Sequence, residues 1–280
     1  MSETSSSTPD YPAKPPVDNS GGGGSSVPLL ALRGISKNFG PVQALQRVDL
    51  DIPAGQVTAL VGDNGAGKST LIKAIAGIYA PSSGTMMWNG EEVHPHTPRD
   101  AAALGIATVY QDLALCDNID IVGNMFLGFE ATSAGLLDEI SMELKTVQTL
   151  KDLQVSTVKS VRQQVGSLSG GQRQAIAVAR AVMREAKLVI MDEPTAALGV
   201  TQTANVLNLI KTLSSRGIAV IVISHNLNDV FAVADRIAVM YLGNLVSNGP
   251  ISKYDPSSTV ELITTGASER VEPHPLHTFA

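Results

Sequence analysis

The chain has 280 residues, of which 44% are hydrophobic, so it carries enough apolar material for one large domain or two modest domains. The formal net charge is −6 without any dense block of Lys and Arg, which argues against a dedicated nucleic-acid binder. Cys116 is the only cysteine, so no disulfide forms within one chain, and no apolar run approaches the roughly 18 residues of a membrane span.

The N-terminal part of the chain changes character near residue 29. Residues 1–28 are rich in Ser, Pro and Gly and bury too little apolar surface to offset ordering, so we predict a disordered tail rather than a secretory signal. After it, 29–39 and 42–52 look like half-buried strands, and 56–62 looks like a short buried strand. The stretch 68–80 has the apolar spacing of a helix.

The stretch GDNGAGKST joins that strand to that helix and matches the pattern G-x-x-x-x-G-K-[ST]. Glycines let the backbone curl so that successive N–H groups point at phosphate oxygens, and the following helix adds the positive end of its dipole. Lys68 supplies a cation for the β- and γ-phosphates, and the Ser69 hydroxyl is a ligand for Mg²⁺. We therefore predict a nucleotide phosphate site over the whole loop, which consists of Gly62, Asp63, Asn64, Gly65, Ala66, Gly67, Lys68, Ser69 and Thr70.

The middle of the chain begins with β signals and then loses them. Residues 81–93 predict a strand and a hairpin, and 106–111 predict a further strand. Between them, Thr97 and Gly105 are the residue types that begin and end a helix. The segment 112–166 lacks strand signals, so we expect it to be mostly helical.

The last third of the chain alternates between the two periodicities, in the order helix 171–185, strand 188–191, helix 202–215, strand 219–224 and helix 227–234. A hairpin near 243–244 and a helix over 258–264 follow, with Ser258 and Glu261 as a capping box, and a flexible tail is expected over 266–280. Strands that alternate with helices predict an α/β fold with a parallel sheet covered on both faces.

Two further motifs add chemistry to the phosphate loop. Asp192 and Glu193 follow an apolar strand, where Asp192 would anchor Mg²⁺ and Glu193 would polarise water as a general base. The alternative is a strand that simply stops at acidic residues. The stretch LSGGQRQ opens a helix at Ser169, whose free amides favour an anion, and the alternative there is an ordinary capped helix.

Taken together, these motifs make residues 29–265 resemble the ATP-binding subunits of ABC transporters. The resemblance depends on GDNGAGKST, LSGGQRQ, LVIMDEP and VISHN, in the order and spacing of that family. It implies a P-loop NTPase fold with a mainly parallel core sheet, an N-terminal antiparallel β subdomain and a helical subdomain at about 112–166.

The resemblance also implies roles for individual residues. Gln111 in VYQD is similar to the family's Q-loop glutamine, which contacts Mg²⁺ and water and senses the membrane partner, and His225 is similar to the switch histidine on the γ-phosphate. Phe39 lies where the family places an aromatic residue, more often Tyr, that stacks on adenine. The signature motif, which contacts ATP held by the opposite subunit, corresponds to Ser169, Gly170, Gly171 and Gln172.

The residues alone leave alternatives for these positions. Gln111 is otherwise an ordinary surface residue, His225 a structural histidine at a strand end, and Phe39 a core residue. One position departs from the family pattern, because Gly199 in TAALG stands where an aspartate that links the two sites is expected. TAALG, VYQDLAL and NMFLG instead resemble the branch that imports ribose, xylose and fructose.

From this resemblance we expect a Mg²⁺-dependent ATPase that works as a pair and powers sugar uptake. The implied partners are transmembrane permease subunits, an extracytoplasmic sugar-binding protein and a second ATP-binding subunit, with a homodimer favoured and no nucleic acid. The implied location is cytoplasmic, on the inner face of the cell membrane. The rival readings are a non-transport ABC ATPase acting on nucleic acid or the ribosome, and a regulatory nucleotide-binding module without turnover.

Overall fold

The computed structural model describes residues 27–133 and 135–271. The expected N-terminal tail therefore lies outside the described residues except for Val27 and Pro28, and the expected C-terminal tail is described only as far as Val271. None of the helices in these residues is both long enough and apolar enough to cross a membrane.

A six-stranded sheet forms the centre of the molecule, with the strand order β12-β11-β3-β10-β9-β6. Five of its strands are parallel, and β12 pairs antiparallel with β11 at one edge. The predicted apolar runs supply its buried strands, since a sheet covered on both faces needs continuous apolar sequence. The strands are β3 (Val57–Gly62), β6 (Ile106–Val109), β9 (Leu188–Asp192), β10 (Ala219–Ile223), β11 (Arg236–Tyr241) and β12 (Asn244–Pro250).

A second, four-stranded sheet has the order β2-β1-β4-β5 and is antiparallel throughout. In its register Leu30 lies opposite Ile52 on one side and Trp88 on the other. This sheet confirms the antiparallel β subdomain that the family resemblance implied. Its strands are β1 (Leu30–Phe39), β2 (Val42–Ile52), β4 (Ser83–Trp88) and β5 (Glu91–Val93).

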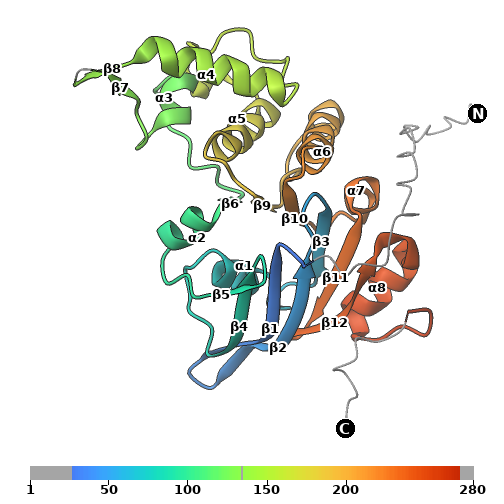
Figure 1. Cartoon of the computed structure of the whole chain (residues 1–280). Helices are drawn as coiled ribbons and strands as arrows, with labels where there is room; N and C mark the ends of the chain where they lie inside the picture. The colour runs from blue at the N-terminus through green and yellow to red at the C-terminus, as the bar shows by residue number, and fades with distance from the viewer. Residues whose placement is uncertain (1–26, 134, 272–280) are drawn as a thin grey trace, which may run out of the picture.

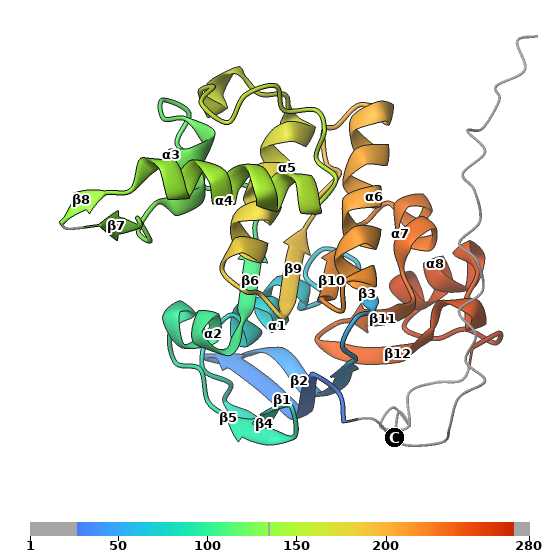
Figure 2. The same ribbon diagram turned by 45° about the horizontal axis from the view of Figure 1, so that its top comes forward.

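The helices are divided between the two faces of the central sheet. Figures 1 and 2 show α5 and α6 side by side on one face, while α1 lies with the antiparallel sheet on the other. The helices are α1 (Lys68–Ile75), α2 (Pro98–Leu104), α3 (Ile121–Phe126), α4 (Glu139–Asp152), α5 (Gly170–Met183), α6 (Val200–Ser215), α7 (Leu227–Val233) and α8 (Pro256–Thr265), with short 3-10 turns η1 (Val165–Ser167) and η2 (Ile251–Lys253).

Alternate side chains of the central strands feed two separate cores. In β10, Val220 and Val222 pack in the core that contains α5 and α6. Their neighbours Ile221 and Ile223 pack in the core that contains α1 and the antiparallel sheet. The strand is buried on both faces because successive side chains of a strand point in opposite directions. The central sheet is therefore packed against a core on each face, and this packing holds its strand ends in place.

Two expectations about local structure are wrong. The segment 112–166 is not mostly helical, since the only α-helices among its described residues are α3 and α4, and it also contains a small hairpin, β7 (Thr132–Ser133) and β8 (Leu136–Leu137). The hairpin was not predicted because two-residue strands are too short to show an alternating pattern. The last helix is capped by Asp255 and not by Ser258: Asp255 Oδ1 accepts from the Ser258 N–H at 2.8 Å. Pro256 explains the earlier start, since its fixed φ suits the first helical position.

The residues after α8 fold back on that helix as far as they are described. Ser268 Oγ donates to Glu261 Oε2 at 2.8 Å. Arg270 pairs with Asp255 at 3.9 Å, and this contact returns the chain to the N-cap of α8. Both contacts tie residues 268–270 to the last helix.

Candidate nucleotide-binding site

The four motif-bearing segments meet at one edge of the central sheet. In the strand register, Asp192 at the end of β9 pairs with Ile223 at the end of β10, and Leu60 of β3 pairs with the same residue. Val109 at the end of β6 pairs with Met191. Because parallel strands bring their carboxyl ends to the same edge, the loops that follow these strands are neighbours. This edge is the position where α/β proteins bind ligands.

The phosphate loop requires glycine at both ends. Gly62 has φ +154° and a Cβ atom there would clash with the Met240 carbonyl oxygen, and at Gly67, with φ +101°, it would lie 2.8 Å from the Ala44 oxygen. The loop is closed from inside by Lys68, whose Nζ donates to the carbonyl oxygens of Gly62 at 2.7 Å and Asp63 at 2.9 Å. The curled backbone leads directly into α1, which is the arrangement that the predicted phosphate site needs.

The charges at this edge are held partly out of water. Burial lowers the pKa of Lys68 below its ordinary value, while Glu193 and the other nearby carboxylates act to raise it. Burial also raises the pKa of Asp192, and the adjacent Glu193 raises it further, whereas Lys68 acts to lower it. Both ions are therefore destabilised in the chain by itself. A phosphate beside Lys68 and a cation beside Asp192 would relieve these two costs.

Glu193 and His225 form a direct contact. His225 Nδ1 lies 2.9 Å from Glu193 Oε1, and the Glu193 backbone N–H donates to the Ile223 oxygen at 2.9 Å. Glu193 has φ +49°, a left-handed conformation that is strained for a residue with a side chain and is typical of functional sites. The Glu193 carboxyl is 19% exposed and the His225 ring is 78% exposed. A largely enclosed carboxyl group thus lies against an exposed imidazole, and the separate motifs did not indicate this pairing.

Gln111 lies slightly farther from the sheet than expected. β6 ends at Val109, so the predicted strand 106–111 is two residues too long, and Gln111 is exposed in the loop that follows. Tyr110 lies between Val109 and Gln111 in the chain. Burial raises the pKa of Tyr110, and the negative charge of the nearby Asp192 raises it further. The sequence gives no signal for Tyr110, because a tyrosine at a strand end has no distinctive pattern.

Phe39 is not a core residue, since it is 43% exposed. Its ring meets the edge of Tyr79 at a centroid distance of 5.3 Å, and Lys37 Nζ lies 5.2 Å from the centre of the Phe39 ring. Tyr79 follows α1 and was not predicted as a site residue. Aromatic residues make up only 4% of the chain, so each exposed aromatic residue could have been considered as a partner for a nucleobase. The pair offers an exposed aromatic surface of the kind that a nucleobase contacts.

The signature stretch forms a capped helix end away from the phosphate loop. Ser169 Oγ accepts from the Gln172 N–H at 3.4 Å, Gln172 Oε1 accepts from the Ser169 N–H at 2.9 Å, and Gln172 Nε2 donates to the Thr157 oxygen at 2.6 Å. Gly171 lies against Gln202 of α6. No hydrogen bond or ion pair within residues 27–133 and 135–271 joins this stretch to the phosphate loop. Within the described residues, the two predicted anion sites therefore make no polar contact with each other.

Gly199, the departure from the family pattern, is the N-cap of α6 with φ −73°. A Cβ atom there would meet nothing within 4 Å. The glycine is therefore not required by backbone conformation or by crowding, and nothing in the structure explains why it replaces an aspartate.

The residues present suit a nucleotide with a hard cation. The Ser69 hydroxyl, the Asp192 carboxylate and the Gln111 amide offer the oxygen donors that Mg²⁺ prefers. The glycine cradle and Lys68 suit phosphate oxygens, as described above. Both components of a metal–nucleotide complex thus match donors at this edge of the sheet.

Comparisons with known proteins identify the family. The family model described as ABC transporter matches residues 45–196. The fructose import ATP-binding protein FrcA of Rhizobium meliloti is 44% identical over 86% of this chain and 95% of its own length. The xylose/arabinose import ATP-binding protein XylG of Sulfolobus acidocaldarius is 42% identical over 87% of this chain and 96% of its own length.

A solved structure agrees with the sequence relatives. The ADP conformation of MJ1267, an ATP-binding cassette of an ABC transporter, superposes with a TM-score of 0.72 and 26% identity, covering 85% of this chain and 95% of that chain. Both sheets and the phosphate loop described above are the expected parts of such a cassette. The chain therefore belongs to the ABC transporter family and is an ATP-binding, ATP-hydrolysing member of it.

Proposed function

We propose that this chain is the ATPase subunit of a monosaccharide importer. Two relatives that match nearly their whole length are named for the import of fructose and of xylose or arabinose, and their high identity is the observation that carries the proposal. The net charge of −6 gives no support to the rival class of nucleic-acid ATPases. The sugar itself would be selected by the partner proteins.

In the proposed reaction, the phosphate loop binds the β- and γ-phosphates of ATP, and Lys68 exchanges its carbonyl partners for phosphate oxygens. Mg²⁺ held by Ser69, Gln111 and Asp192 would supply neutralising charge at these phosphates. Glu193 accepts a proton from the attacking water as general base. His225 Nδ1 already contacts Glu193, so its other nitrogen is left to contact the γ-phosphate.

The site of one chain would be completed by a second chain. Ser169 and Gln172 are half-buried at the start of α5, Gly170 between them is exposed, and residues Asp63 to Gly65 of the phosphate loop are exposed as well. We infer that each loop is closed by the partner's Ser169–Gln172 stretch. Because this contact exists only in the closed pair, ATP stabilises the pair and hydrolysis releases it.

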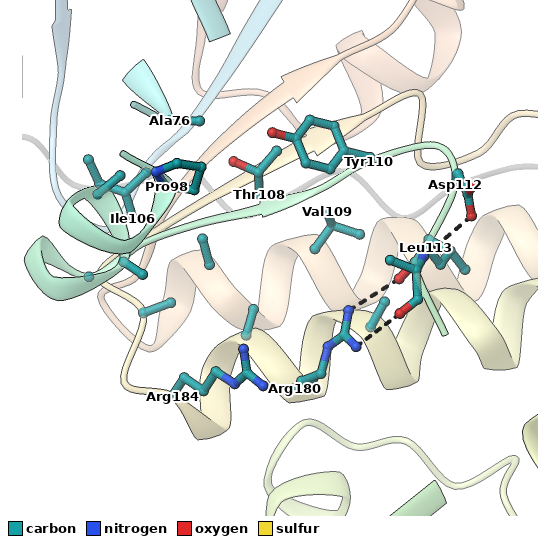
Figure 3. A pocket seen from close by; sticks show the side chains of 18 residues that line it. Ala76, Pro98, Ile106, Thr108, Val109, Tyr110, Asp112, Leu113, Arg180 and Arg184 are labelled. Carbon is teal, nitrogen blue, oxygen red and sulfur yellow. Dashed lines mark hydrogen bonds between the residues drawn. The ribbon is translucent and has the colours of Figure 1, made fainter. Parts of the chain in front are cut away.

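The permease would contact the chain near Gln111. A cavity of about 230 Å³ lies between β6, α2 and α5, and its lining includes Tyr110 and Asp112, the two chain neighbours of Gln111 (Figure 3). An element of the permease seated at this cavity would sense the position of Gln111. Through the permease, the chain would lie at the inner face of the membrane, and an extracytoplasmic binding protein would deliver the sugar.

The proposal is tested by substitution of the general base together with sugar uptake. In cells that lack this chain, plasmid-borne wild type should restore uptake of labelled fructose, xylose or ribose, and Glu193→Gln should not. With the purified chain, Glu193→Gln should lower phosphate release at saturating ATP by about 10²- to 10⁴-fold, because general-base catalysis contributes this much.

The control is Glu91→Gln, which removes an exposed carboxylate on β5 and should leave phosphate release unchanged. Undiminished turnover of Glu193→Gln would refute the assignment of the base. Normal uptake of all three sugars in cells without the chain would refute sugar import while leaving the ATPase assignment intact.

A further inference from the structure

Two arginines lie on one face of α5, the helix that begins at the signature stretch, and a third, Arg184, caps its C-terminus. Their positions, 173, 180 and 184, are separated by seven and four residues, a spacing that places side chains on the same side of a helix. Each donates to a backbone carbonyl outside the helix: Arg173 to Gly166, Arg180 to Leu113 and Ala114, and Arg184 to Leu127. This face therefore attaches α5 to the chain segments that precede it.

Arg180 makes the most specific of these attachments. Its Nη1 donates to the Ala114 oxygen at 3.1 Å and its Nη2 to the Leu113 oxygen at 3.2 Å, so the planar guanidinium holds two successive peptide groups (Figure 3). No ion pair in the described part of the chain involves Arg180. Burial lowers the pKa of Arg180, which means that the buried cation is destabilised. The two hydrogen bonds to carbonyl oxygens offset part of this cost. The two carbonyls lie only two and three residues after Gln111.

The same segment is joined to the start of α5 as well. The backbone N–H groups of Gly166 and Val165 donate to the oxygens of Asp117 at 2.9 Å and Ile119 at 3.1 Å. Residues 113–119 are thus bonded beside Ser169 at one end and to Arg180 at the other. With a rise of about 1.5 Å per residue, the rigid helix between Gly170 and Arg180 spans about 15 Å.

Residues 113–119 are therefore bonded near both ends of α5. From these contacts we propose that Arg180 is a positioning residue that couples the two ATP sites of the pair. It fixes the segment after Gln111 to the helix that carries Ser169, so that Gln111 at a chain's own ATP and Ser169 at the partner's ATP move together. The inference rests on the proposed roles of Gln111 and Ser169. A guanidinium suits this task, because its fork of donors fixes both position and orientation.

A double-substitution cycle tests the coupling. Steady-state phosphate release would be measured for the full-length wild type, Arg180→Met, Gln111→Ala and the double variant, together with the thermal midpoint of each. If Arg180 acts through Gln111, Arg180→Met should lower kcat about tenfold in the wild-type background and less than about twofold in the Gln111→Ala background. The KM for ATP should change little, because the phosphate loop is untouched.

Arg184→Met is the matched control. It removes a guanidinium at the C-cap of α5, one turn further on, where the carbonyl partner is Leu127 and not the segment after Gln111. Its effect on kcat, whatever the size, should be the same in both backgrounds. Should Arg180→Met fold poorly, Arg180→Lys takes its place in the cycle. Lysine keeps the charge but cannot hold both carbonyls in a fixed plane, so a smaller loss of the same pattern is expected.

The outcomes separate the two levels of the argument. Equal losses for Arg180→Met in both backgrounds, or a folded Arg180→Met with wild-type kcat, overturn the positioning role even where Gln111→Ala itself lowers turnover. If Gln111→Ala alone leaves turnover unchanged, the proposed role of Gln111 fails and the coupling fails with it.

Discussion

At the scale of single residues, the site is dominated by charges whose burial opposes their ionisation. Burial and the adjacent Glu193 raise the pKa of Asp192, so its ionised form is less stable in the fold than in the unfolded chain. A raised folded pKa means that this residue costs stability at neutral pH. That cost shrinks as the pH falls through the raised folded pKa, and it is gone below the ordinary carboxyl value of 3.8, where the side chain is protonated in both states.

Asp192→Asn should therefore stabilise the nucleotide-free chain at pH 7.5, where it removes an unfavourable charge. The gain in thermal midpoint should shrink as the pH is lowered toward 4, and MgATP should stabilise the variant less than the wild type. Differential scanning calorimetry at several pH values, with and without MgATP, provides the measurement. A variant that is less stable than wild type at pH 7.5 would contradict the assigned cost of the carboxylate.

At the scale of elements, the segment between β6 and α4 is organised by one buried amide. Asn124 of α3 is fully buried, and its Oδ1 accepts from the Cys116 N–H at 2.7 Å. Its Nδ2 donates to the oxygens of Cys116 at 2.9 Å, Asp120 at 3.0 Å and Ile119 at 3.3 Å. This side chain thus bonds four backbone groups between Cys116 and Asp120, and it helps to hold the loop after Gln111 in its conformation.

Asn124→Ala should lower the free energy of unfolding by about 2–4 kcal/mol, because it leaves buried donors and acceptors unpaired and opens a small cavity. Urea denaturation measures the loss. Asn228→Ala, which removes an exposed amide on α7, is the control and should change stability by less than about 0.5 kcal/mol. An Asn124→Ala loss as small as that of the control would show that the amide does not organise the segment.

At the scale of the whole molecule, the proposed pairing means that one chain contributes to two ATP sites, with its phosphate loop in one and its signature stretch in the other. In the background of Glu193→Gln, which preserves ATP, we expect ATP to convert the chain from monomer to dimer. Adding Ser169→Arg should keep ATP binding and abolish the dimer, because a bulky side chain at the start of α5 would occupy the proposed position of the partner's γ-phosphate. Light scattering after size exclusion, with and without ATP, measures both species.

Ser215→Arg, at the exposed end of α6, is the matched control for added bulk and charge, and it should dimerise normally. Dimers that persist in the Ser169→Arg variant would rule out closure by the partner's signature stretch. ATP binding to each variant, measured by fluorescence titration, shows that the phosphate loop is intact.

Local patterns predicted most of the elements and the separate motifs. The apolar runs of β3, β9 and β10 could be recognised because strands buried on both faces have continuous apolar sequence. The glycines at 62 and 67 could be recognised from the spacing of the pattern G-x-x-x-x-G-K-[ST]. The structure gives the physical reason for that spacing, because the backbone conformations at both positions exclude other residues. The β7–β8 hairpin and the Asp255 cap were missed, since very short strands and competing cap residues leave little periodic signal.

By itself, therefore, the sequence determined the α/β class, the family and the phosphate loop, all of which depend on residues that are close together in the chain. Only the tertiary structure decided which distant groups meet: the His225 ring on Glu193, Tyr79 on Phe39, and Arg180 on the segment after Gln111. It also showed that the signature helix end lies apart from the phosphate loop of its own chain. Such pairings are set by strand order and by the packing of α5 on the sheet, and neither leaves a periodic trace in the residues that take part.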